Sequence, residues 1–74
     1  MRNDFQKEFP KRLQRLRERR GIKRSILGEL CGLSKNVIAR YERGECEPSS
    51  SSIAAIADFF DVSVDYLLGR TDNP

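Results

Sequence analysis

Five side chains between positions 35 and 43 are of types that can recognise nucleic acid. They are Lys35, Asn36, Ala39, Arg40 and Arg43. A helix through this segment turns about 100° per residue, which places all five within one arc of roughly 140°. Arginine and lysine can donate to guanine O6 and N7, asparagine can pair with adenine, and alanine can contact the thymine methyl group. This face predicts a helix that reads base edges in a DNA major groove.

The opposite side of the same helix is apolar. It carries Val37, Ile38 and Tyr41, which are suited to packing against a core. An ordinary amphipathic surface helix has the same two faces, so the helix alone leaves both interpretations open. Asn36 also has two interpretations, because its amide can pair with adenine or bond a phosphate.

The spacing of residues before this helix favours a helix-turn-helix over residues 23–44. We predict a second helix over residues 24–31 and a third that begins at Ser34, a residue type that caps helices, and ends at Gly44. Gly28 inside the second helix costs about 1 kcal/mol relative to alanine. Close packing of the third helix against Gly28 explains that cost, and a simple local weakness is the alternative. Gly32 provides the positive φ that a tight turn requires.

Helical spacing also dominates the N-terminal part of the chain. One apolar stripe consists of Phe5, Phe9, Leu13 and Leu16. Because proline fits only the first turn of a helix, the main helix is expected to start near Phe9 or Pro10, and Gly21 is expected to end it. In the second helix, the side chains expected to point inward are Leu27, Leu30 and Cys31.

Two further helices are expected towards the C-terminus. Ser49 can cap a fourth helix whose apolar positions follow the i, i+3, i+4, i+7 pattern. Those positions are Ile53, Ile56, Ala57 and Phe60. The serine run over residues 49–52 has a flexible linker as its alternative interpretation. A short fifth helix over residues 64–68 should stop at Gly69.

Composition and charge bound the possible functions. The chain has 74 residues, enough for one domain that buries about 60% of its unfolded surface. Residues 1–24 have ten basic and three acidic side chains, a balance of +7, whereas residues 25–74 balance at −4, which together give the net charge of +3. A basic first third suggests a polyanionic partner, although such a charged helix face is more often simply solvated.

Several classes of site are not expected. The sequence has no histidine, and its two cysteines, Cys31 and Cys46, do not have a zinc-binding spacing. We expect free thiols, with Cys31 buried and Cys46 exposed, and one disulfide as the alternative. We predict no enzyme activity, no cofactor and no metal, because no credible catalytic group is present. Residues 1–24 have no apolar run, so we expect neither a signal peptide nor a membrane span, and we place the protein in the cytoplasm.

Motif and spacing together resemble the lambda-repressor-like helix-turn-helix family, also called the Xre or Cro type. The matching stretches are residues 12–22 (RLQRLRERRGI), 27–34 (LGELCGLS), 38–44 (IARYERG), 47–49 (EPS) and 62–69 (VSVDYLLG). The resemblance covers residues 9–69, which we take as the DNA-binding domain. Residues 1–8 are then an N-terminal extension, and residues 70–74 a frayed tail.

The resemblance implies an all-α, compact five-helix domain, found in bacterial or phage regulators that bind operator DNA, usually as dimers. Carried over by position, Lys35, Asn36 and Arg40 match base-reading residues. Arg24 and Arg43 match phosphate-binding positions. A partly buried ion pair is implied between Arg17 and Glu42, joining the first and third helices.

Three positions depart from the family pattern. Lys23 replaces a capping threonine or serine, so the second helix is expected to start raggedly, but the lysine adds a phosphate donor. Ile26 stands at a position that is usually polar. It is interpreted either as a contact with a partner or as an exposed apolar residue that the domain tolerates. Ser50 replaces a common apolar residue, so the fourth helix is expected to be loosely anchored.

The sequence therefore predicts sequence-specific binding to double-stranded operator DNA by a transcriptional regulator of the repressor type. We expect a homodimer on DNA, formed through Tyr66, Leu67 and their neighbours, with no membrane partner and no small-molecule effector. A protein-interaction module on the same fold, such as an antirepressor or antitoxin subunit, is the main alternative. An RNA-binding domain is less well supported, because Tyr41 lies on the packing face and no other aromatic side chain interleaves with the exposed basic residues.

Overall fold

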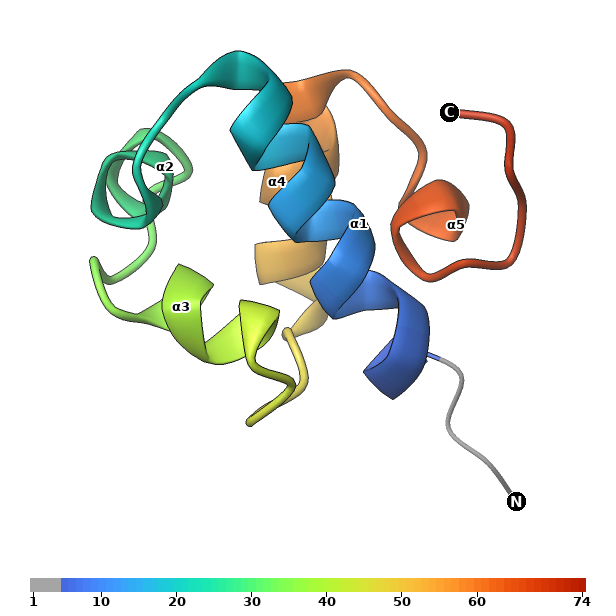
Figure 1. The fold of residues 1–74 in the computed structure, drawn as a ribbon, viewed down its shortest axis with the longest axis horizontal. Coiled ribbons are helices and arrows are strands. Elements are labelled where there is room, and N and C mark those ends of the chain that lie inside the picture. Colours follow the sequence, from blue (N-terminus) through green and yellow to red (C-terminus); the bar gives the residue numbers. More distant parts are fainter. Residues whose placement is uncertain (1–4) are drawn as a thin grey trace.

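The computed structural model describes the backbone of residues 5–74 and the side chains from Lys7 onward. Over this range the chain forms five helices and no strand (Figure 1). The helices are α1 (Phe5–Arg20), α2 (Arg24–Leu30), α3 (Val37–Glu42), α4 (Ser50–Phe60) and α5 (Val64–Leu67). The all-α, five-helix prediction is confirmed. None of these helices is long and apolar enough to cross a membrane.

The hydrophobic core takes side chains from all five helices. Its buried members are Phe9, Leu13, Leu27, Ile38, Tyr41, Ile53, Ile56, Ala57, Phe60 and Leu67. Helix α1 contacts both α3 and α5, and Figure 1 shows it between the α2–α3 pair on one side and α5 on the other, with α4 behind. The longest helix therefore fixes the position of the α2–α3 pair.

Helix α1 begins earlier than predicted. It starts at Phe5 and carries Pro10 in its interior, whereas the sequence placed the helix start at Phe9 or Pro10. Packing holds the turn that precedes the proline: Phe9 is 1% exposed, and its ring lies edge-on to Tyr41 at 5.6 Å. These contacts offset the cost of an interior proline. Residues 5–8 of the predicted N-terminal extension, residues 1–8, therefore belong to α1, whereas residues 1–4 and the side chain of Phe5 lie outside the described residues.

Helix α2 begins at Arg24 as predicted, and Lys23 at its N-cap makes no side-chain capping bond. The prediction that Leu30 points inward is wrong, because this residue is 58% exposed. Leu27 and Gly28 are the buried residues of α2, and Leu30 lies about 110° from the middle of the face they share. Cys31 is half-buried, whereas it was predicted to be buried.

The cysteines are both free and both half-buried. The prediction of an exposed Cys46 is therefore wrong, because this residue packs against the hydrophobic core. Burial raises the pKa of the Cys31 thiol, which favours its neutral, unreactive form.

Serine caps start the last two helices. The Ser49 hydroxyl accepts a hydrogen bond from the Ser52 amide at 3.1 Å, and the Ser63 hydroxyl accepts one from the Tyr66 amide at 2.9 Å. The cap at Ser49 is confirmed, and the linker interpretation of residues 49–52 is wrong. Ser50 lies beside a shallow cavity of about 230 Å³, lined by Glu47, Pro48, Ser50, Ile53 and Leu68.

The C-terminal segment differs from the frayed tail that was predicted. Arg12 on α1 donates to the carbonyl of Thr71 at 2.8 Å and to the Asp72 carboxylate at 2.7 Å. The same guanidinium lies over the Tyr66 ring at 4.5 Å. Residues 71–72 are thus held against α1, and Figure 1 shows the chain end curving around α5. Leu67 is fully buried, so its prediction as a dimer contact is wrong.

Candidate nucleic-acid interface

The α2–α3 pair is held together by a close approach at Gly28. A Cβ atom at this position would lie 2.6 Å from the carbonyl oxygen of Ser34 and 3.4 Å from the Cα atom of Lys35. Only glycine admits the turn at this distance. The close-packing interpretation of Gly28 is therefore confirmed, and the alternative of a local weakness is not needed.

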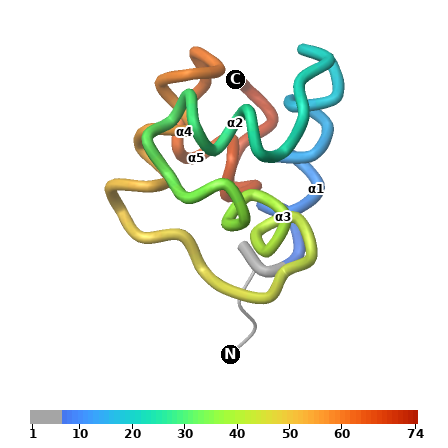
Figure 2. Tube along the Cα trace, turned by 90° about the vertical axis from the view of Figure 1, so that its left-hand side faces the viewer, coloured from blue at the N-terminus to red at the C-terminus, as the bar shows by residue number. Residues whose placement is uncertain are grey.

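The turn after α2 satisfies the open end of that helix. Gly32 has a φ of +72°, which L side chains rarely adopt. The Gly32 amide donates to the Glu29 carbonyl at 3.0 Å, and the Leu33 amide donates to the Gly28 carbonyl at 2.7 Å. This pair of bonds is a Schellman motif. It reverses the chain so that α3 crosses close to α2, and Figure 2 shows the two helices joined by this turn.

Helix α3 is shorter than predicted. It begins at Val37, three residues after the predicted start at Ser34, and ends at Glu42. Lys35 and Asn36 therefore lie in a turn, which closes where the Val37 amide donates to the Ser34 carbonyl at 3.3 Å. The contact of Gly28 with this turn explains the late start, because it fixes Ser34 and Lys35 before regular helix begins. The Asn36 amide makes no capping bond.

The two faces predicted for this segment are present. Lys35 and Asn36 are exposed, and the side chains of Arg40 and Arg43 are more than half exposed. Ala39 between them is half-buried. The packing face holds Ile38 and Tyr41, which are buried, and Val37, which is half-buried. The structure thus gathers the sequence-predicted donors at the start and along one side of α3.

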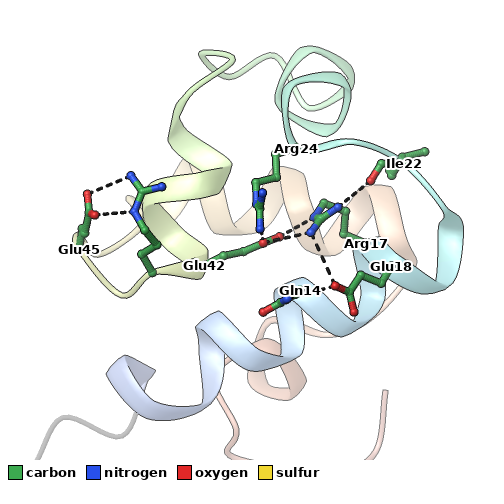
Figure 3. Close-up of polar contacts among 8 residues, drawn as sticks. Gln14, Arg17, Glu18, Ile22, Arg24, Glu42 and Glu45 are labelled. Carbon is green, nitrogen blue, oxygen red and sulfur yellow. Dashed lines mark hydrogen bonds and ion pairs between the residues drawn. The ribbon is translucent and has the colours of Figure 1, made fainter.

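A buried glutamate ties α3 to the two helices before it. Arg17 donates to Glu42 through Nε to Oε2 at 2.6 Å and through Nη2 to Oε1 at 3.2 Å. Arg24 donates to the same carboxylate through Nε at 2.9 Å. The side chains of Glu42 and Arg17 are 3% and 11% exposed. Figure 3 shows this three-residue network, and the predicted pair between α1 and α3 is present.

The network also determines how Arg17 and Arg24 are held. The hydrogen bond to Glu42 raises the pKa of Arg17 above its ordinary value. Arg17 also donates through Nη1 to the Ile22 carbonyl at 2.9 Å. Arg24, which the sequence placed at the DNA backbone, has its side chain 51% exposed. Its Nε contact with Glu42 fixes the side chain at the start of α2 and leaves half of its surface to solvent.

A second carboxylate, at Glu45, was not singled out from the sequence. Arg43 donates to it through Nε, and Arg40 Nε lies 3.8 Å from it. This contact requires the backbone to turn back after α3: Gly44 has a φ of +71°, and the Glu45 amide donates to the Arg40 carbonyl at 3.0 Å. The sequence signal for this contact is short: Glu45 follows Arg43 by two residues, with the helix-ending Gly44 between them.

Comparison with known proteins identifies the family of this chain. Residues 8–67 match a family model described as a helix-turn-helix domain. The chain belongs to the helix-turn-helix family. The matched range contains Gly28, Gly32 and all of α3.

Two curated relatives come from Bacillus subtilis (strain 168). The uncharacterized HTH-type transcriptional regulator YobD is 36% identical over 66 residues, which cover 89% of this chain and 59% of YobD. The HTH-type transcriptional regulator AnsR is 39% identical over 59 residues, which cover 80% of this chain and 51% of AnsR. The chain thus spans little more than half the length of these relatives.

A solved structure extends the likeness to the arrangement of the helices. The P22 c2 repressor protein, solved in complex with a synthetic operator, matches with a TM-score of 0.76 and 30% identity. The match covers 80% of this chain and 89% of that chain. The resemblance to the lambda-repressor-like group, stated from the motifs, is confirmed.

Proposed function

We propose that this helix-turn-helix domain binds double-stranded operator DNA sequence-specifically and represses transcription, in the cytoplasm of a bacterial or phage-infected cell. One observation carries the proposal: the close approach at Gly28 presents the Lys35–Asn36 turn and the exposed side of α3 as one surface of hydrogen-bond donors. Such a surface enters a major groove with its N-terminal residues nearest the bases. The P22 c2 repressor, which shares the fold, was solved with an operator.

The side chains divide into two roles in this proposal. Lys35, Asn36 and Arg40 contact base edges, with Ala39 placed to meet a thymine methyl group. Three further side chains, Lys23, Arg24 and Arg43, bind phosphates and fix the register without reading sequence. All the charged and amide side chains in both sets are exposed or more than half exposed.

The decisive experiment is selection of bound sequences from a random DNA pool, followed by measurement of affinity at several salt concentrations. We expect one preferred site, bound about 10³-fold or more tightly than random DNA. Enrichment of no sequence, with weak binding that disappears at moderate salt, would contradict operator recognition.

Substitutions on the selected operator should separate the two roles. Arg24→Ala and Arg43→Ala are expected to weaken binding to all sequences about equally and to lower the salt slope by up to roughly one unit each. Asn36→Ala and Arg40→Ala are expected to cost about 1–3 kcal/mol on the preferred site and to relax preference at one or two base pairs. A uniform loss for Asn36→Ala would place this side chain with the phosphate binders.

We also propose that two copies bind a two-fold symmetric operator. One copy of α3 reads only a few base pairs, too few to select a site among the many competitors in a genome. Half-sites should therefore lie about 34 Å apart, one helical turn of DNA. Sedimentation of the complex on the complete selected site should give two protomers per duplex, and a single protomer on that site would refute the proposal.

A protein-interaction module is the second candidate, favoured by two exposed apolar residues on α2. Ile26 is 41% exposed and Leu30 is 58% exposed, and a spacing of four residues makes them neighbours on one side of the helix. An antirepressor or antitoxin subunit on this fold would bind DNA weakly and without preference. Selection of no preferred DNA sequence, together with a protein partner whose binding is lost in Leu30→Ser, would favour this candidate.

A further inference from the structure

Glu45 lies directly against two arginines that the proposed function assigns to DNA. Its contact with Arg43 is bidentate, through Nε to Oε2 and through Nη2 to Oε1 at 3.4 Å. Its Oε1 is also 3.8 Å from Arg40 Nε. Figure 3 shows Glu45 beyond the C-terminal end of α3, well separated from the buried network at Glu42. One exposed carboxylate is therefore shared by two exposed cations.

The chemistry of this contact is that of a phosphate contact. A guanidinium group binds a carboxylate and a phosphate with the same planar, two-point geometry. Glu45 occupies the Nε–Nη2 edge of the Arg43 guanidinium, so a DNA phosphate can bind that edge with two-point geometry only by replacing Glu45. The carboxylate is then left close to the DNA backbone, where like charges repel. The side chain of Glu45 is 46% exposed, so the exchange needs no unfolding.

We propose that Glu45 is an internal competitor of the DNA backbone, which holds Arg43 until a phosphate displaces it and so keeps the sequence-independent part of DNA binding weak. This inference rests on the proposed function, because it takes Arg43 as a phosphate binder. The hydrogen bond from Arg43 also lowers the pKa of Glu45, so the competing group remains an anion at neutral pH.

The test is Glu45→Gln, which keeps the size of the side chain and removes its charge. If one further phosphate contact becomes fully available, affinity should rise about fivefold at 150 mM salt and about fifteenfold at 50 mM, with the salt slope steeper by about one unit. Because phosphates look alike at every step, the gain should be equal on the selected operator and on random DNA. No gain, a loss, or a gain confined to the operator would overturn the proposal.

Two further variants identify the cause of the gain. Asp58→Asn makes the same change of net charge on the exposed surface of α4, and we expect it to alter affinity by less than twofold. In an Arg43→Gln background, the gain from Glu45→Gln should fall to less than half. An equal gain from Asp58→Asn, or an undiminished gain without Arg43, would mean that net charge rather than competition is responsible.

The same measurements separate this inference from the proposed function. If Arg43→Gln leaves affinity and salt slope unchanged on all DNA, the phosphate role of Arg43 fails. If Arg43→Gln weakens binding while Glu45→Gln has no effect, only the competition fails. Melting temperatures check that both variants are folded, and they should stay within a few degrees of the wild type because exposed ion pairs contribute little stability.

Discussion

Glu42→Ala is expected to lower the free energy of unfolding by about 3 kcal/mol, which corresponds to a fall in melting temperature of about 12–24 °C for a domain of this size. The variant leaves Arg17 charged, with a side chain 11% exposed, and it keeps the Ile22 carbonyl at 2.9 Å and the more distant Glu18 carboxylate at 4.0 Å. A buried charge that loses its partner is costly even where the intact pair itself stabilises little.

The effect should come from the pair and not from loss of a glutamate as such. Glu29→Ala removes an exposed glutamate of α2 and should change stability by no more than about 0.5 kcal/mol. In an Arg17→Met background, where the buried cation is already gone, Glu42→Ala should cost at least about 1 kcal/mol less than in the wild type. Urea unfolding of the four proteins measures this coupling, and strictly additive losses would show that Arg17 and Glu42 act separately.

Local signals predicted most of the secondary structure because their causes are local. Capping at Ser49 is a bond to the Ser52 amide three residues away, and the buried positions of α4 follow one helical period. Gly32 and Gly44 end helices because each has a positive φ. These elements could be placed from residue type and spacing alone.

The errors arise where tertiary contacts override local preference. Pro10 was expected to start α1, but burial of Phe9 against Tyr41 stabilises an additional turn before it. Ser34 was expected to cap α3, but its carbonyl is held against Gly28 and the helix starts later. Leu30 is as apolar as Leu27, and the packing of α2 against the other helices decides which of the two is buried.

The candidate site residues that depend on one helix could be predicted from the sequence, whereas those that depend on tertiary contacts could not. The face of α3 could be predicted, because a helix fixes which of its own side chains lie together. The Arg17–Glu42 pair came from family resemblance, since the two residues are far apart in sequence. The contacts of Arg12 with residues 71–72 and of Arg43 with Glu45 depend on how chain segments turn back, which no spacing rule encodes.

The second large effect is expected for Gly28→Ala. Alanine favours a helix over glycine by about 1 kcal/mol, so an isolated α2 would gain stability. In the folded protein the new methyl group would lie 2.6 Å from the Ser34 carbonyl oxygen, which is backbone and cannot rotate away. Overpacking of this kind costs about 1–3 kcal/mol after relaxation. We expect a net loss of stability, and a Gly28→Ala protein more stable than the wild type would contradict the close packing.

Gly32→Ala is a matched control four residues away. It adds the same methyl group at a position where no atom beyond the adjacent residues lies within 4 Å, and its cost arises from a φ of +72°. Forcing an L residue into this region costs about 1–2 kcal/mol. The two variants should therefore lose comparable stability for different reasons, one from a contact between α2 and the turn before α3, the other from backbone strain within the turn.

The two variants should differ in DNA binding, which distinguishes a displaced reading surface from a merely less stable domain. To relieve the contact at Gly28, the turn carrying Lys35 and Asn36 has to move away from α2. Base contacts depend on positions held within about 0.5 Å, so Gly28→Ala should lose affinity for the selected operator about tenfold or more while random DNA is bound nearly as before. Measurements at a temperature where both variants are fully folded remove the contribution of stability. Under those conditions Gly32→Ala should retain most of its operator preference, and equal losses in the two variants would mean that the spacing at Gly28 does not position the reading surface.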